Sequence, residues 1–262
     1  MHTELQVRSF IHTSDIEWRD PGFHQHSSLE IEFVLEGRGL FEWRQGRLPL
    51  EMGHIVIIPA KTDHRFEAYG KNRYAVIHLE HVPSSISELL TKLSPEQDSP
   101  TFFTLSRLDK ERFERLFREW IRIKASHLNE QARTYRAWME VILLFLLEHS
   151  YKDQQSFTIA KAADYIRENL QEGVQISALA EMAGFSETGF RRLFEQVYHM
   201  SPKQYQQQCR MAEAKWLLSS SDKEMMEIAL QIGFTRLHSF SQWFKQTEGV
   251  SPTEWRKLQH HG

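Results

Sequence analysis

Residues 180–186 read Ala-Glu-Met-Ala-Gly-Phe-Ser, and residues 229–235 repeat this stretch as Ala-Leu-Gln-Ile-Gly-Phe-Thr. A short amphipathic segment and a Ser-Pro pair follow each copy. The two glycines are 49 positions apart, whereas the Ser-Pro pairs at Ser201 and Ser251 are 50 apart. The second copy therefore carries one extra residue in its turn, and the matching order of features indicates a duplicated structural unit.

The first copy has the local signals of two helices joined by a tight turn. Gly184 supplies the turn, and we expect Ser177 and Ser186 to cap the helices on either side of it. Ser201 then starts a long helix that reaches about residue 218. Serine is a good cap, the proline after it suits the first helical position, and the glutamine three residues beyond the cap completes a capping box.

The second copy uses the same devices. We expect Ser221, with Glu224 three residues later, to start its first helix, and Gly233 to make the turn. Thr235 is then expected to cap the following helix, and Ser251 the last helix of the chain. The second helix of such a unit can lie in the major groove of DNA, which is about 12 Å wide. Two units joined by one stiff helix can reach successive grooves, about 34 Å apart.

Residues 176–256 resemble the DNA-binding domain of the AraC/XylS family of bacterial transcription regulators, most closely in the stretches 227–234, 240–245 and 249–256. The resemblance implies two helix-turn-helix units joined by a linker helix. It places Thr188, Arg191 and Arg192 in a first groove, and Arg236, His238, Ser239, Ser241 and Gln242 in a second. Arginine can bind guanine and glutamine can bind adenine. Members of the family often carry arginine where Gln242 stands, which leaves the base preferred there open.

The N-terminal part of the chain has the period of strands. Short apolar or alternating runs, separated by glycines and polar residues, predict strands at residues 30–35, 39–44, 54–58, 64–68 and 74–79. Residues 1 to about 20 are expected to form an arm, and residues 94–104 a loop. Many short strands with polar turns favour a β-sandwich or a small barrel.

From Asp109 onward the apolar residues recur with the period of helices, and this change divides the chain into a strand-rich part and a helical part. Amphipathic or apolar helices are predicted at residues 109–124 and 131–149, and another at 160–170. The resulting fold class is α+β with two domains: an N-terminal β-barrel, which resembles the cupin barrel through the residues described next, with following helices, and an all-α C-terminal domain. We expect the barrel at residues 1–105, a dimerisation or packing segment at 106–150, a linker at 151–157 and the DNA-binding domain at 158–262.

A second group of residues lies in the predicted barrel. Residues two apart on a strand share a face, so His24, His26 and Glu30 can converge. Together with His64, they resemble the two motifs of the cupin barrel, in which the matching residues ligate a divalent metal. Imidazole and carboxylate groups suit iron, manganese, nickel, copper or zinc. Three alternatives stay open for this set: a bound metal, a polar cluster lining a ligand pocket, or histidines with a structural role.

The pocket of such a barrel would take a small-molecule effector. The effector-binding residues predicted are His24, His26, Glu30, Trp43 and His64. Glu32 shares the face of Glu30 and is expected at the barrel mouth. Aromatic and aliphatic walls around a few polar groups are typical of small-molecule sites; the walls expected here are Phe33, Phe41, Trp43, Ile55, Ile57 and Phe66, and most of these aromatics are alternatively core. Trp18 or Trp43 is a candidate to stack on a sugar.

Bulk composition limits the alternatives. Cys209 is the only cysteine, which excludes an internal disulfide framework and fits a reducing cytosol. The longest apolar run, residues 141–147, is far short of the ~20 residues of a membrane span. The first eight residues lack the order of a secretory signal, so we expect a cytoplasmic protein without a membrane partner. From residue 157 onward twelve Lys and Arg residues balance twelve Asp and Glu residues. A positive DNA-binding face must therefore come from placement.

These observations predict a sequence-specific, DNA-binding transcription regulator controlled by a small molecule, and no enzymatic activity. The resemblance implies a homodimer that activates transcription through RNA polymerase, the commoner mode in the family, with repression as the alternative. The rival interpretation is a metal-dependent cupin oxygenase or isomerase with an appended helical domain. Departures from the cupin motifs at Trp18, Lys61 and Ala68 disfavour it. An architectural or RNA-binding protein is disfavoured by the lack of basic tails.

Overall fold

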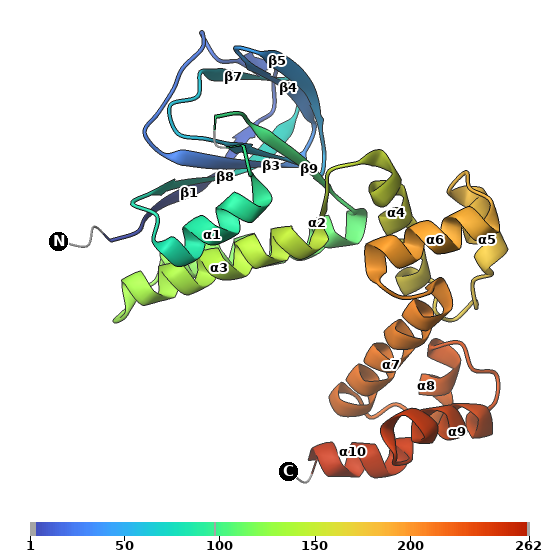
Figure 1. Cartoon of the computed structure of the whole chain (residues 1–262). Helices are drawn as coiled ribbons and strands as arrows, with labels where there is room; N and C mark the ends of the chain where they lie inside the picture. The colour runs from blue at the N-terminus through green and yellow to red at the C-terminus, as the bar shows by residue number, and fades with distance from the viewer. Residues whose placement is uncertain (1–3, 97, 261–262) are drawn as a thin grey trace. The chain divides into compact units, whose positions relative to one another are not determined.

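The computed structural model describes residues 4–96 and 98–260. It divides into two compact units, Met1–Phe157 and Thr158–Gly262. Both are drawn in Figure 1, and each is described here by itself.

The N-terminal unit contains two antiparallel sheets (Figure 1). The six-stranded sheet has the order β1 (Gln6–Ser14), β8 (Asn72–Glu80), β3 (Leu29–Glu36), β6 (His54–Ile58), β9 (Thr101–Leu105) and β10 (Ser150–Tyr151). The four-stranded sheet has the order β2 (Trp18–Arg19), β7 (His64–Ala68), β4 (Arg38–Trp43) and β5 (Gly46–Glu51). All five strands predicted from sequence are present, within two residues of their expected ends.

Six elements were not predicted, namely β1, β2, α1 (Ser84–Leu93), β5, β9 and β10. The strands β1 and β2 lie within the expected arm, α1 precedes the expected loop, and β9 forms the end of that loop. Exposed and half-buried residues predominate along β1, so its sequence lacks the alternation of a half-buried strand. It is an edge strand whose pairing with β8 supplies the order that its sequence does not indicate.

The two faces of the six-stranded sheet bury different cores. Phe33, Ile55 and Ile57 belong to the core that contains the helical residues Phe113 and Phe117. The core between the two sheets instead contains other residues of the same strands, with partners from β4, β5 and β7: Val34, Phe41, Leu50, Val56, Ile58, Phe66, Ala68, Tyr74 and Val76. The expectation that Phe33, Ile55 and Ile57 line a pocket beside the His/Glu set is therefore wrong, because side chains alternate between faces along a strand.

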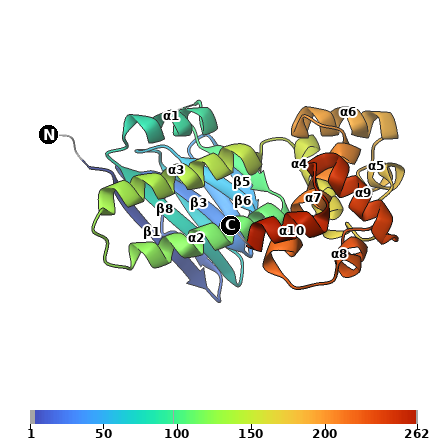
Figure 2. The same cartoon turned by 90° about the horizontal axis from the view of Figure 1, so that it is seen from below.

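Three helices cover the outer face of the six-stranded sheet, as Figure 2 shows: α1, α2 (Arg107–Lys124) and α3 (Gln131–His149). Both predicted helices are found here, and α2 begins two residues earlier than expected because Ser106 caps it. The fully buried Trp120 of α2 donates a hydrogen bond from Nε1 to Ser9 Oγ at 2.7 Å, which ties the helix to β1.

The expected linker is partly ordered secondary structure. Buried Tyr151 belongs to β10, which pairs with β9, and α4 (Gln154–Glu168) begins three residues later. The polar composition of this stretch reflects the exposure of residues 152, 153 and 155.

Helices are the only regular elements in the described residues of the C-terminal unit (Figure 1). After α4 it contains α5 (Ile176–Met182), α6 (Glu187–Tyr198), α7 (Pro202–Ser220), α8 (Met225–Gln231), α9 (Leu237–Glu248) and α10 (Pro252–His260). One core surrounds Phe190 and Phe194 of the first repeat, and another surrounds Phe240 and Phe244 of the second. The long helix α7 contributes to both cores, so two helix-turn-helix units share one connecting helix, as predicted.

The turn glycines and capping residues of the repeat account for most of these helix boundaries. Gly184 and Gly233 adopt φ of 73° and 88°, and the next residue in each copy donates its N–H back to the helix before the turn. Ser186 accepts a hydrogen bond from the N–H of Gly189, and Ser201 forms a complete capping box with Gln204. Ser251 likewise accepts from the N–H of Glu254.

Three predicted caps are wrong. Ser177 lies inside the first turn of α5, which begins at Ile176. Ser221 ends α7, and the capping box of α8 is formed by Glu224 instead. Thr235 stands one position before Arg236, the residue that precedes α9. The inserted residue of the second copy thus lies between its glycine and its second helix, where it shifts the helix start.

Candidate functional site

A row of polar side chains crosses the inner face of the six-stranded sheet. Arg8 of β1 is the cross-strand partner of His78 of β8, and His78 is the partner of Glu30 of β3. Directly opposed residues of antiparallel strands share a face, so the three side chains lie in one line. His26 reaches this row from the loop before β3, and His64 from the first position of β7 in the other sheet.

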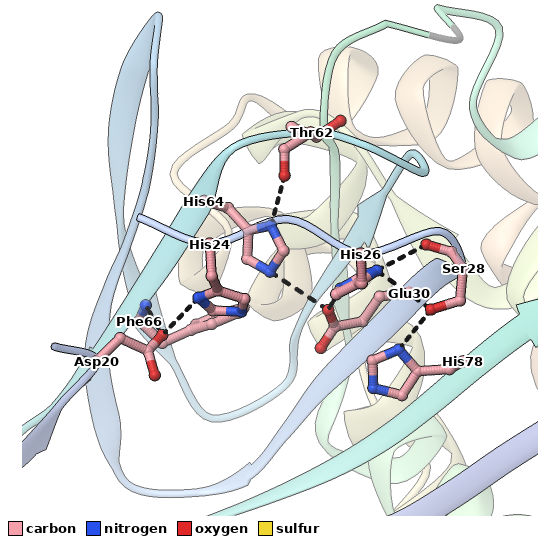
Figure 3. A network of polar contacts seen from close by, with 9 residues as sticks. All are labelled: Asp20, His24, His26, Ser28, Glu30, Thr62, His64, Phe66 and His78. Atoms are coloured by element: carbon pink, nitrogen blue, oxygen red, sulfur yellow. Dashed lines mark hydrogen bonds and ion pairs between the residues drawn. The ribbon is translucent and has the colours of Figure 1, made fainter. Parts of the chain in front are cut away.

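His26, Glu30 and His64 converge on one point (Figure 3). The Nε2 atom of His26 lies 2.6 Å from Glu30 Oε2, and the Nε2 atom of His64 lies 3.4 Å from the same oxygen. Their Nδ1 atoms are turned away, each 2.8 Å from a backbone carbonyl, that of Ser28 for His26 and that of Thr62 for His64. A carbonyl oxygen only accepts, so both Nδ1 atoms carry the proton and both Nε2 atoms face the carboxylate.

The charges of this cluster are mutually dependent. Burial by itself raises the pKa of Glu30, but the hydrogen bond from His26 and the nearby imidazole of His64 outweigh it and hold that pKa well below its usual range. The Glu30 hydrogen bond, working against burial, raises the pKa of His26. Burial, followed by the negative charge of Glu30, raises the pKa of Glu32 well above its ordinary value. Glu32 is 5% exposed, so the expectation that it stands at the barrel mouth is wrong.

The donor set fits a divalent metal. One ligand atom each from His26, Glu30 and His64 lies within 4.8 Å of the others, and His64 Nε2 is buried without a hydrogen bond. A backbone carbonyl that fixes the tautomer of a histidine is a common support for metal ligands. Within the described ranges His24 is outside this group: its side chain is 46% exposed, and its Nδ1 lies 3.7 Å from Asp20.

The two tryptophans proposed for sugar stacking differ in their surroundings. Trp43 is half-buried, with its ring centroid 5.6 Å from that of Phe41 and 5.2 Å from that of Phe102. Trp18 donates from Nε1 to the side chain of Asn72 at 3.1 Å. Both rings therefore pack against the core between the sheets.

Sequence reasoning missed His78. Its Nδ1 lies 3.0 Å from Ser28 Oγ, and its ring centroid is 4.9 Å from that of His26 (Figure 3). His78 stands 48 positions from Glu30, and only the pairing of β8 with β3 brings the two together. A local signal existed, because His78 lies at the alternate position to Val76 and Tyr74 along one strand face.

A cleft of about 760 Å³ opens beside the cluster. His26, Ser28 and His78 form part of its wall, and the start of α3 forms another part at Gln131 and Tyr135. The remaining lining consists of residues 4–8, around the start of β1, together with Ser27, Glu80 and Ala132. Of the three clustered residues only His26 lines the cleft, while Glu30 and His64 are buried behind it.

The polar residues assigned to DNA lie on the second helix of each unit, except Arg236, which immediately precedes α9. Seven of the eight are exposed and Ser241 is half-buried: Thr188, Arg191, Arg192, Arg236, His238, Ser239, Ser241 and Gln242. Positions three and four apart on a helix share a face. Thr188, Arg191 and Arg192 therefore form one face of α6, and their counterparts fifty positions later, His238, Ser241 and Gln242, form one face of α9. Exposed Lys245 extends the second face and was not predicted.

The two faces differ in charge. Arg191 is paired with Glu187 on the same helix, through a contact of 3.2 Å from Nε to Oε1, whereas the α9 counterpart of Glu187 is Leu237.

In the portion of the chain that the structure describes, no helix is long and apolar enough to cross a membrane.

A barrel with a buried polar cluster, carried in one chain with two helix-turn-helix units, defines a ligand-responsive DNA-binding regulator. Comparison with known protein families agrees: residues 10–145 match the AraC-like ligand binding domain, and residues 179–258 match a helix-turn-helix domain. The chain belongs to the AraC family of transcription regulators. It is a transcriptional regulator controlled by a small molecule, and not an enzyme.

The similarity extends through both units. YobQ, an uncharacterized HTH-type transcriptional regulator of Bacillus subtilis, is 26% identical over 233 residues, which cover 89% of this chain and 88% of YobQ. The HTH-type transcriptional activator RhaR of Yersinia pseudotuberculosis is 26% identical over 254 residues, which cover 89% of this chain and 84% of RhaR. The melibiose operon regulatory protein of Escherichia coli is 25% identical over 292 residues, which cover 97% of this chain and 91% of that protein.

Proposed function

We propose that an effector bound in the N-terminal barrel changes how pairs of DNA-binding domains are placed on a promoter, and that the result is activation. The observation that carries this proposal is the matched pair of exposed polar faces on α6 and α9, fifty residues apart along the chain. Such a pair suits two successive major grooves. That one relative is named a transcriptional activator supports the sign of the effect.

The roles of the segments follow from this proposal. Residues 1–105 sense the effector, residues 106–150 form the dimer contact, residues 151–157 transmit the change and residues 158–262 bind DNA. Base and phosphate contacts are assigned to Thr188, Arg191, Arg192, Arg236, His238, Ser239, Ser241 and Gln242. The arginine pair of α6 makes the firmer contacts, because Arg can bind guanine through two hydrogen bonds.

The effector is assigned to the polar cluster. His26, Glu30 and His64 form the centre, His24 and Trp43 flank it, and the cleft beside His78 is the entrance. A ligand can shift the regulator only by its difference in affinity between the two arrangements, typically about 1 to 3 kcal/mol. A site that touches both β1 and the start of α3 can respond to the position of the helical layer.

A homodimer and contact with RNA polymerase complete the proposal. Val141 and Leu144 of α3 are 46% and 47% exposed, although both are aliphatic. An exposed aliphatic stripe on a helix favours a partner surface. Recruitment of RNA polymerase is the commoner mode of activation in the family that this chain resembles.

Binding to random-sequence duplex DNA tests the function. The purified full chain is expected to enrich a sequence with two conserved blocks about one helical turn apart. Footprinting on the promoters of the neighbouring genes should then protect the same sequence. Enrichment of unrelated sequences, with no shared block, would refute sequence-specific regulation.

A divalent metal at His26, Glu30 and His64 is a second, separable element of the proposed sensor. The carbonyl-bound Nδ1 atoms and the unsatisfied Nε2 of His64 favour it. A bound metal would offer an open coordination position to a donor atom of the effector. These residues would hold it, with iron, manganese, nickel, copper and zinc all compatible with the donors.

Metal content is the direct measurement. The wild-type chain dialysed against zinc or iron(II) is expected to retain about one ion, and His64→Ala to lose it, because the variant has two of three ligands. His127→Ala, at an exposed histidine of the same unit, is the control and should keep the ion. Wild-type protein that retains no ion would exclude the metal and leave a ligand-lining cluster.

A further inference from the structure

The two turn glycines of the repeat have different surroundings. Both adopt positive φ, but a Cβ atom added to Gly184 would meet nothing within 4 Å. A Cβ added to Gly233 would lie 2.3 Å from the carbonyl oxygen of Leu170 and 2.6 Å from Arg210 Nη2. Contact at such a distance is impossible without moving backbone. The turn of the second helix-turn-helix unit therefore lies directly against the backbone at Leu170, which belongs to the core of the first helix-turn-helix unit, and only a glycine fits there.

Arg210 holds this junction together. It lies in the middle of α7, donates from Nη2 to the carbonyl of Leu170 at 3.2 Å, and places its guanidinium 5.6 Å from the centroid of the Phe234 ring. Leu170 is buried in the core of the first unit, and Phe234 packs against the core of the second. One side chain thus links the two units.

The contacts of Arg210 are costly to maintain. Burial lowers the pKa of its guanidinium, and its Nε atom is buried without a hydrogen-bond partner. Burial of an incompletely bonded charge is unfavourable, so stability alone does not account for an arginine at this position. Fixed geometry between the two units does account for it.

We propose that the junction of Leu170, Arg210 and Gly233 sets the separation and rotation at which the two recognition helices meet DNA. Arg210 is then a positioning residue, which touches no base, and the spacing between the two blocks of the operator is a property of this junction. The inference rests on the proposed reading of two successive grooves.

The required accuracy explains why a second connection beside α7 is useful. Moving a half-site by one base pair displaces it by about 3.4 Å and rotates it by about a tenth of a turn. The two cores meet along α7 between Tyr205 and Met211, so bending there would change the register of α9 in its groove. Linked modules bind cooperatively only where the link matches the distance between their sites.

Selection from random-sequence DNA, with full chains, tests the inference. Gly233→Asn is compared with Gly184→Asn, because asparagine tolerates the left-handed conformation that both turns adopt and only the first variant disturbs the junction. Wild type and Gly184→Asn are expected to enrich two blocks at one fixed spacing, and to bind duplexes with one inserted base pair about tenfold or more weakly. Gly233→Asn should enrich the same blocks at several spacings and lose most of this discrimination.

Arg210→Met gives an independent readout. It retains side-chain volume and should relax the spacing preference in the same way, whereas Arg210→Lys should restore part of it. Thermal unfolding identifies any variant that fails to fold. Unchanged spacing selectivity in folded Arg210→Met and Gly233→Asn would overturn the junction. Failure of the wild type to enrich any two-block sequence would refute the proposed function instead.

Discussion

At the scale of single residues, Glu32 shows how the cluster divides its charge. It is buried beside Glu30, and the two carboxyl groups interact directly. Two adjacent buried carboxylates repel each other, so one of them holds a proton. The histidines contact Glu30 and lower its pKa, whereas burial and the negative charge of Glu30 raise the pKa of Glu32.

Glu32→Gln is expected to stabilise the N-terminal unit increasingly as pH rises from 5 to 8. The folded-state pKa of Glu32 is raised, so above the unfolded value near 4.5 the folded state retains a proton that the unfolded state releases, and stability falls as pH rises. Glutamine removes this loss and keeps a hydrogen-bond donor. Urea unfolding of the variant and the wild type at pH 5 and pH 8 measures the change in the free energy of unfolding, and Glu88→Gln, at an exposed glutamate, is the control. An equal effect at pH 5 and pH 8 would contradict the assignment.

Arg192→Ala is expected to weaken DNA binding by about 1 to 3 kcal/mol and to relax the preference at one base position. The exposed guanidinium lies on the face of α6 with Thr188. Arg47→Ala, at an exposed arginine of β5, removes the same charge and should leave affinity unchanged. Gel shifts with the selected duplex compare the two, and equal affinities would remove Arg192 from the readout.

At the scale of elements, caps decide where the helices of the repeat begin. Serine preceded most helix starts in the predicted pattern, yet only some of these serines cap. Ser201 accepts from the N–H of Gln204, which in turn accepts from the N–H of Ser201. Ser177 has no such role, because α5 starts one residue before it.

Ser201→Ala is expected to destabilise the start of α7 by about 1 kcal/mol, because the backbone N–H of Gln204 loses the Ser201 hydroxyl that accepts from it. Ser177→Ala should have no effect or a slightly stabilising one, since alanine is the better helix former. Hydrogen exchange of the α5 and α7 amides reports each helix separately. Equal protection in α7 of wild type and Ser201→Ala would show that the capping box does not determine its stability.

Strand β1 illustrates what element-scale patterns miss. Its alternation is weak because it lies at the edge of the sheet, and its partner β8 begins 58 residues after β1 ends. Helices α2 and α3 were predictable for the opposite reason, since each carries a continuous apolar stripe that repeats within one turn. Local period can therefore reveal helices and central strands, but not an edge strand held by a distant neighbour.

At the scale of the whole molecule, the proposed dimer depends on the outer surface of α3. Leu144→Glu is expected to shift the protein toward monomer in sedimentation velocity, because it places a charge in an apolar contact. Met52→Glu, at a residue 53% exposed in the same unit, is the matched control and should sediment as wild type. A wild-type chain that is monomeric with DNA present would exclude this interface.

The sequence by itself determined the class of protein, the duplicated unit, the helix that joins its copies, and the residue types that gather in the barrel. Those features depend on spacing within a few residues, which the period of a helix or strand converts directly into a shared face. Only the tertiary structure decided that His26 and His64 contact Glu30 while His24 turns to Asp20, that His78 joins them, and that Gly233 lies against Leu170. These contacts depend on strand register and on the approach of distant backbones, which no local pattern encodes.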